Sequence, residues 1–117
     1  MLHVENLTQN QVLIAYGRVA DTFWTRLKGL IGVRQLLHGD GLLITRCNSV
    51  HCMFMSIPID VIYADRDNRI VALDRNMKPW ALGRIHWKAH DVLELPIGAI
   101  DRTNTTVGDQ LLVRLTA

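Results

Sequence analysis

Features that would mark a membrane protein, a secreted protein or a nucleic-acid-binding protein are scarce in this chain. No apolar run approaches the ~20 residues that a membrane-spanning helix needs. The first residues lack the basic and apolar regions of a secretory signal. The 13 basic and 11 acidic residues are scattered, without a block of one sign. We therefore expect no membrane span, predict no nucleic-acid partner and take a cytoplasmic location as the default.

Cysteine is also scarce, since only Cys47 and Cys52 are present. Two thiols are too few for a disulfide framework or for paired zinc-binding CxxC motifs. The chain also has no glycine-rich phosphate loop, no dinucleotide fingerprint and no serine nucleophile elbow. The sequence thus predicts no cofactor and no metal.

What the chain does have is enough apolar material for one core, with 117 residues of which 49% are hydrophobic. Neither a low-complexity linker nor a repeat divides it, so we expect a single domain over 1–117. Short apolar and β-branched runs predict strands at 2–7, 11–16, 42–45, 50–55, 59–64, 69–73, 92–95 and 110–115. The strands over 50–73 should form a meander, with a hairpin loop at 65–68 in which Asn68 accepts a positive φ.

One amphipathic helix is predicted from Asp21 to Gly32, because its apolar residues fall on a single stripe. A helical turn is expected at 98–102. The predicted fold class is mainly β (α+β), a small partly closed β-barrel of about seven strands with one packed amphipathic helix.

Residues 77–88 form an irregular connection that is long for so small a domain, which is typical of a binding loop. Trp80, Arg84, Trp87 and Lys88 would offer stacking faces and cations to a nucleotide, a sugar or an acidic protein loop. The alternative is a loop held in place by two core tryptophans.

Soft ligand atoms gather between Cys47 and Met55, a combination that suits Cu(I) or Zn(II). On a strand, however, His51, Met53 and Met55 would share one face and Cys52 the other, so no tetrahedral set is preformed. Burial in the core is the favoured interpretation of Cys52 and of at least one methionine.

The sequence gives only weak support for a histidine zinc site, a cysteine nucleophile or acid-base catalysis. His86 and His90 would share a face if 84–90 were helical, as some zinc sites require, but Pro79 and Gly83 oppose a helix there. As a nucleophile Cys52 would need a base from one of these two histidines. Asp60 is an acid within an apolar strand. It would serve acid-base chemistry or, as we favour, bond turn amides next to Pro58.

Five motifs in fixed order resemble an uncharacterised prokaryotic family, domain of unknown function 192. They are RLKGLIG (26–32), GLLI (41–44), SVHCMFMSIPIDVIYAD (49–65), LELPIG (93–98) and VGD (107–109). The resemblance implies a compact β-rich barrel with one packed helix. It makes Pro58-Ile59-Asp60, with His51, Met55 and Glu94, the candidate site. Many members of that family are exported, which weighs against the cytoplasmic default.

Three functions follow as hypotheses. The first is a non-enzymatic module that binds a small ligand or a protein partner through the 77–90 loop and the rim near His51 and Asp60. The second is a small hydrolase in which Asp60 or Glu94 acts with His51, and the third is a soft-metal protein. The predicted ligand-binding residues are His51, Met55, Asp60, Trp80, Arg84, Trp87 and Glu94.

Overall fold

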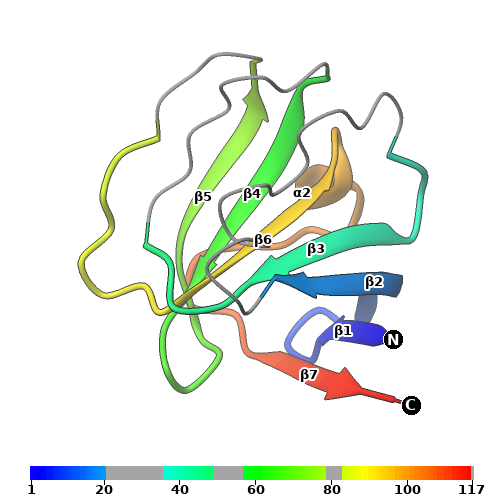
Figure 1. The fold of residues 1–117 in the computed structure, drawn as a ribbon, viewed down its shortest axis with the longest axis horizontal. Helices are drawn as coiled ribbons and strands as arrows, with labels where there is room; N and C mark the ends of the chain where they lie inside the picture. The colour runs from blue at the N-terminus through cyan, green and yellow to red at the C-terminus, as the bar shows by residue number, and fades with distance from the viewer. Residues whose placement is uncertain (21–35, 49–56, 79–82, 117) are drawn as a thin grey trace.

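The computed structural model describes residues 1–20, 36–48, 57–78 and 83–116, which form one strongly curled β-sheet with a short helix (Figure 1). The elements are β1 (Leu2–Asn6), β2 (Gln11–Ala20), β3 (Asp40–Ile44), β4 (Ile59–Ala64), β5 (Ile70–Met77), β6 (Asp91–Pro96), α2 (Ala99–Arg102) and β7 (Leu111–Leu115). The mainly β prediction is confirmed. The predicted strand at 50–55 and the predicted helix over 21–32 lie outside the described residues.

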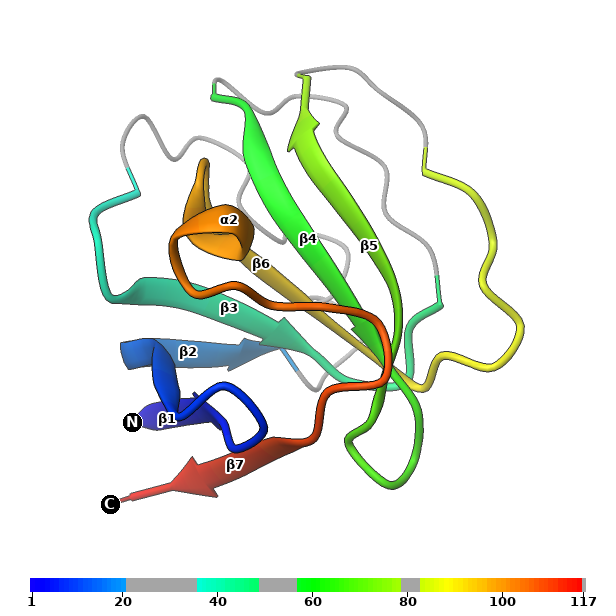
Figure 2. The ribbon, with the colours of Figure 1, turned by 180° about the vertical axis from the view of Figure 1, so that it is seen from behind.

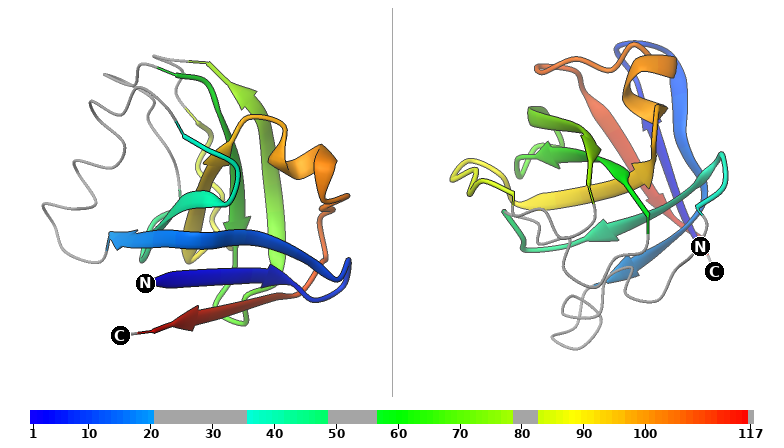
Figure 3. Two further views of the ribbon diagram at one scale, coloured as in Figure 1. Left: turned by 90° about the vertical axis from the view of Figure 1, so that its right-hand side faces the viewer. Right: turned by 90° about the horizontal axis from the view of Figure 1, so that it is seen from above.

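The sheet has the order β5-β4-β6-β3-β2-β1-β7. Only β2 and β3 run parallel; every other neighbouring pair in the described sheet is antiparallel. The edge strands meet at one end, where Arg69 pairs with Gln110. The Ile70 amide donates to the Asp109 carbonyl at 2.9 Å, and the Leu111 amide donates to the Asn68 carbonyl at 2.8 Å. The barrel is therefore partly closed, as predicted (Figure 3).

The predicted meander over 50–73 is wrong in its strand order. β4 and β5 form the expected hairpin, and Asn68 in its loop has a φ of 60°. The other neighbour of β4 is β6, which comes about thirty residues later in the chain and lies between β4 and β3. Because both edges of β4 are paired and all six of its residues are buried, β4 is the centre of this part of the sheet.

Buried side chains fill both faces of the sheet. The concave face, which α2 and the segment after it cross (Figure 2), holds one apolar cluster. Its main members are Leu2, Val4, Leu13, Ile14, Leu43, Ile62, Ile70, Leu93, Leu95, Ile100 and Leu111. The opposite, convex face holds a second cluster of Ala20, Leu42, Ile44, Ile59, Val61, Tyr63, Met77 and Val92. Alternate residues of β4 and β6 thus point to separate cores.

A buried polar network fastens the closed end of the barrel. Asn6 Nδ2 donates to Asp109 Oδ2 at 2.9 Å and to Thr105 Oγ1 at 3.1 Å. The amide of Thr106 and the side chain of Gln9 donate to the same Asp109 oxygen. Burial acts to raise the pKa of Asp109, but these hydrogen bonds outweigh it and hold the pKa below its ordinary value of 3.8.

Candidate functional site

Asp60, in β4, ties three elements together through its carboxylate. Oδ1 accepts a hydrogen bond from the Asn76 amide at 2.9 Å, and Oδ2 accepts one from the Ile100 amide at 2.9 Å. Asn76, with a φ of 51°, belongs to a bulge in β5 opposite Asp60, and Ile100 lies in the first turn of α2. Asp60 is only 2% exposed. Asp60 thus has the structural role that the sequence favoured, but the amides that it bonds belong to β5 and α2 and not to a turn next to Pro58.

Glu94 lies on the opposite face from Asp60. It is paired with Val61 on β4 and with Leu42 on β3, which both belong to the apolar core on the convex face. Asp60 is paired instead with Leu95, a member of the concave-face cluster. Since directly paired residues share a face, the sheet separates the two carboxyl groups.

The Glu94 side chain is buried without a partner. The residue is 4% exposed, and Oε2 has no hydrogen bond to any described residue. Burial raises the pKa of Glu94 from 4.5 to about 7. A native structure rarely leaves a buried carboxyl oxygen unsatisfied, so this atom calls for an explanation.

Tyr63 is the diagonal neighbour of Glu94 on the convex face, because Tyr63 pairs with Val92 while Glu94 pairs with Val61. Its hydroxyl donates to Asp74 Oδ2 at 2.7 Å. The ring of His86 packs on the ring of Tyr63, with centroids 4.2 Å apart and planes at 50°. Nε2 of His86 is also buried and has no hydrogen bond to a described residue. We call Tyr63, Asp74, His86 and Glu94 the convex-face cluster of polar groups.

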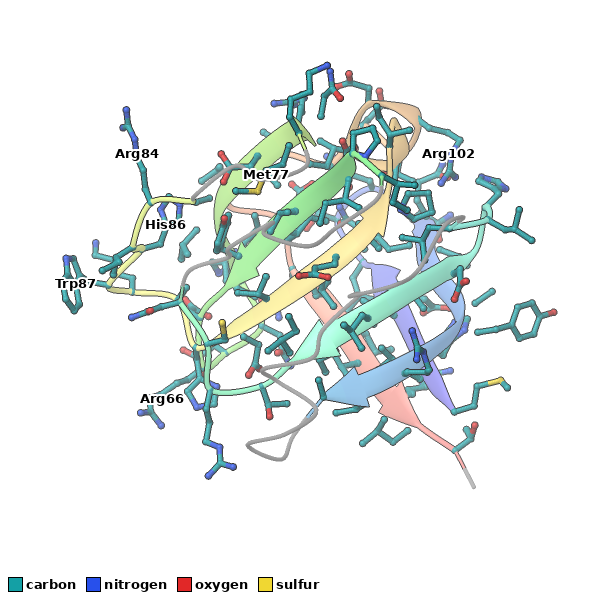
Figure 4. The ribbon with its side chains drawn as sticks, turned by 45° about the horizontal axis from the view of Figure 1, so that its top comes forward. Arg66, Met77, Arg84, His86, Trp87 and Arg102 are labelled. Atoms are coloured by element: carbon teal, nitrogen blue, oxygen red, sulfur yellow. The ribbon has the colours of Figure 1, made fainter. Side chains whose placement is uncertain are left out.

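His86 belongs to the loop 83–90, whose two sides differ. Figure 4 shows His86 turned toward the sheet, whereas Trp87 and Arg84 point away from it. Trp87 is 83% exposed, and Arg84 and Lys88 are exposed as well. Backbone hydrogen bonds hold the loop: the His86 amide donates to the Asn48 carbonyl at 2.9 Å, and the His90 amide donates to the Ala64 carbonyl at 2.7 Å.

The two histidines of this loop do not form a zinc pair. Residues 83–90 contain no helix, and a turn follows His86. His90 Nδ1 lies 3.0 Å from Asp91 Oδ1, while the His86 ring faces Tyr63. Within the four described stretches, no three His, Cys, Asp or Glu side chains are grouped as metal ligands. Cys47 is half-buried and packs beside the apolar cluster of the convex face.

Three of the predicted site residues, His51, Met55 and Trp80, lie outside the described residues, as do Cys52 and Met53. Among the other four, Glu94 belongs to the convex-face cluster, Arg84 and Trp87 lie on the loop that contributes His86, and Asp60 lies apart. Sequence reasoning missed Tyr63 and Asp74. The sequence signal for Tyr63 was the alternation of side chains along a strand. It places Tyr63, two residues after Val61, on the same face of the sheet as Val61.

A separate hollow of about 350 Å³ lies beside the start of β1, the middle of β2 and the end of β7. It is lined by Met1, Leu2, His3, Ala15, Tyr16, Arg114 and Thr116. None of the predicted site residues lines it. In the described residues no helix is long and apolar enough to cross a membrane.

A family model named DUF192 and described as Uncharacterized ACR matches residues 5–113. The chain belongs to the DUF192 family. This confirms the resemblance carried by the five motifs. A UPF0127 protein of Thermococcus sibiricus is 33% identical over 110 residues, covering 91% of this chain and 71% of that protein. A UPF0127 protein of Pyrococcus furiosus is 35% identical over 109 residues, covering 91% of this chain and 93% of the other.

Two crystal structures have the DUF192 chain's fold. A protein of unknown function from Novosphingobium aromaticivorans superposes with a TM-score of 0.82 at 20% identity, over 95% of this chain and 82% of that one. A protein from Sinorhizobium meliloti, provisionally named a transcription regulator, gives 0.80 at 20% identity, over 96% and 91%. At this identity the likeness shows the fold alone.

Proposed function

We propose that this DUF192 protein is a non-enzymatic binding module whose ligand site is the convex-face cluster. The observation that carries the proposal is the pair of buried polar atoms, Glu94 Oε2 and His86 Nε2, for which the described residues supply no hydrogen bond. Leaving a buried polar atom unpaired costs about 1–3 kcal/mol. A ligand that bonds either atom would recover that part of the cost on binding.

The surroundings of the cluster favour binding of a small molecule. Val61, Tyr63 and Val92 are all 0% exposed, so the two unpaired atoms lie in an apolar environment. Binding sites for small molecules are typically apolar with a few convergent polar groups and a perturbed pKa. Glu94, whose pKa is raised to about 7, fits this description.

Binding is also favoured over the hydrolase alternative by the position of Asp60. Both of its oxygens accept backbone hydrogen bonds on the concave face, so neither is available as a base toward the convex face. Glu94 could still act as a general acid, but its Oε2 is not hydrogen-bonded to a nucleophile among the described residues.

The test compares Glu94→Gln with Glu5→Gln, a matched change of a half-exposed glutamate on β1. Each protein is purified from its expressing cells and examined by native mass spectrometry, followed by a fragment screen with ¹⁵N NMR. We expect small molecules to perturb the amides of Leu93, Leu95 and Val61 in the wild type and in Glu5→Gln, and to perturb them much less in Glu94→Gln. A screen in which no compound perturbs these amides would overturn the proposal.

A second candidate function, protein binding, is favoured by Trp87. A tryptophan that is 83% exposed on a loop fixed by backbone hydrogen bonds is typical of an interface anchor. A photo-crosslinking amino acid at position 87 should capture a partner in the host cell. The same reporter at position 16, where the native tyrosine is 69% exposed, is the control. Equal capture at both positions would argue against a docking role for the loop.

A further inference from the structure

We propose that the outer edge of β7 is a docking site for an extended acidic peptide. The peptide adds to the sheet as an antiparallel strand and places a carboxylate opposite Arg114. Addition of a strand to an exposed sheet edge is a recurring mode of peptide recognition. This surface shares no residue with the convex-face cluster, so the proposal goes beyond the function proposed above.

The first argument is the direction of the backbone groups of β7. Thr116 exchanges two backbone hydrogen bonds with Met1, at the start of the β1 side. In an antiparallel ladder, pairs that exchange hydrogen bonds alternate with pairs that do not. Arg114 therefore bonds β1, while Val113 and Leu115 direct their amides and carbonyls away from it.

The same alternation is visible where the barrel closes. The Leu111 amide, two residues before Val113, points outward and donates to the Asn68 carbonyl at 2.8 Å. Beyond this bond, no described residue is hydrogen-bonded to the outward groups of Val113 and Leu115. Figure 1 shows β7 at the rim of the sheet, with β1 on its inner side. The edge is thus open at two residues, and an unpaired strand edge is a template for another strand.

The second argument is the chemistry of the side chains on this edge. Leu115 is 66% exposed, and Arg114 is exposed on the other face of the strand. Among the described residues Arg114 has no ion pair: its cross-strand partner is His3, and the neighbouring Glu5 lies 3.3 Å from His3 Nε2. Arg114 also lines the hollow beside the end of β7, so a carboxylate has space to reach the guanidinium.

The same arginine argues against a second copy of the chain as the occupant. If two β7 strands paired antiparallel through Val113 and Leu115, each Val113 would lie opposite the other Leu115. The two Arg114 side chains would then face each other, and like charges directly opposite are destabilising. A pairing centred on Val113 would need the outward amide of Leu111, which already bonds Asn68. An acidic peptide instead brings the opposite charge to the position that pairs with Arg114.

The experiment uses two blocked heptapeptides of alternating valine and threonine, one with a central glutamate and one with a central lysine. Each is titrated into the whole chain and followed by ¹⁵N NMR. We expect the glutamate peptide to perturb the amides of Val113 and Leu115 and to bind about two- to fivefold more tightly than the lysine peptide. Arg114→Glu should reverse this preference. Arg66→Glu, an equal charge change at an exposed loop position, should preserve it.

Val113→Pro tests the backbone contribution. Proline is tolerated on an edge strand where the N–H faces solvent, so this variant should keep the circular dichroism spectrum of the wild type. It should bind the glutamate peptide about tenfold more weakly, because one donor is lost and the proline ring stands in the path of the added strand.

Three results would overturn the proposal. The first is that neither peptide perturbs the amides of Val113 and Leu115 at millimolar concentration. The second is that wild type and Arg114→Glu bind the two peptides with equal preference. The third is a dimer in sedimentation experiments that Val113→Pro dissociates, which would make a second copy of the chain the occupant of the edge.

Discussion

The carboxylate of Asp60 joins the centre of the sheet to α2 through a single hydrogen bond of 2.9 Å, from the Ile100 amide to Oδ2. The other oxygen holds the Asn76 amide in the bulge of β5. One side chain therefore fixes a strand, a bulge and a helix relative to one another. α2 has only four residues and no side-chain hydrogen bond at its N-cap, so Asp60 supplies a bond that its own sequence does not.

Asp60→Asn should lower the free energy of unfolding by about 3 kcal/mol, because an amide nitrogen would face a backbone N–H donor and the charge-assisted bonds would be lost. Urea denaturation followed by circular dichroism measures the change. Asp67→Asn, at an exposed loop position, is the control and should stay within about 0.5 kcal/mol of the wild type. If both variants unfold at the same urea concentration as the wild type, Asp60 does not have this structural role.

Local sequence patterns predicted the local parts of this structure well. The strand expected at 59–64 has those bounds in the structure, and Asn68 adopts the positive φ expected of its hairpin. What they could not predict was that β6 lies between β3 and β4, because pairing between distant strands depends on how the whole sheet closes. The prediction of a meander over 50–73 was wrong for this reason.

The candidate site was only partly predictable for the same reason. Glu94 was identified through its family motif, and nothing in the local sequence indicates that its carboxyl is buried without a partner. The packing of His86 on Tyr63 joins residues from a strand and an irregular loop, and no period relates them. Asp60 and Glu94 were grouped by resemblance, whereas the alternation of side chains along two paired strands puts them on opposite faces.

A second prediction concerns Gly41, where β3 passes close to β2. A Cβ atom at this position would lie 2.6 Å from Ile14 Cδ1 and 3.2 Å from the Glu94 carbonyl oxygen. Gly41→Ala should therefore destabilise the protein by about 1–3 kcal/mol. In an Ile14→Ala background the same change should cost less, since the atoms of Ile14 that it meets are gone. A double-mutant cycle measures this coupling, and additive effects would contradict the predicted contact.

A third prediction concerns acid unfolding and Asp109. Its folded pKa is lower than its unfolded value, so the stability it contributes is present above the unfolded pKa and is lost as the pH falls through the folded pKa. Asp109→Asn should lower stability near neutral pH by about 1–3 kcal/mol and should flatten the acid limb below about pH 4. Asp67→Asn serves as the control in the same urea titrations. An unchanged acid limb in Asp109→Asn would show that other carboxyl groups control it.

The fourth prediction follows from Glu94, where the sign is opposite. Its pKa rises from 4.5 to about 7 on folding, so the protein binds this proton more tightly when folded. Stability is fully present below the unfolded pKa and is lost as the pH rises through the folded pKa, by about 3 kcal/mol in all. Glu94→Gln, which has no charge to bury, should remove this loss, so that its advantage over the wild type grows between about pH 4.5 and pH 8.

Urea unfolding midpoints at both ends of this range provide the measurement for Glu94→Gln, with Glu5→Gln as the matched control. The quantity compared is the slope of stability with pH, because any cost of the buried amide is the same at every pH. A slope equal to that of the wild type would mean that Glu94 does not titrate in this range.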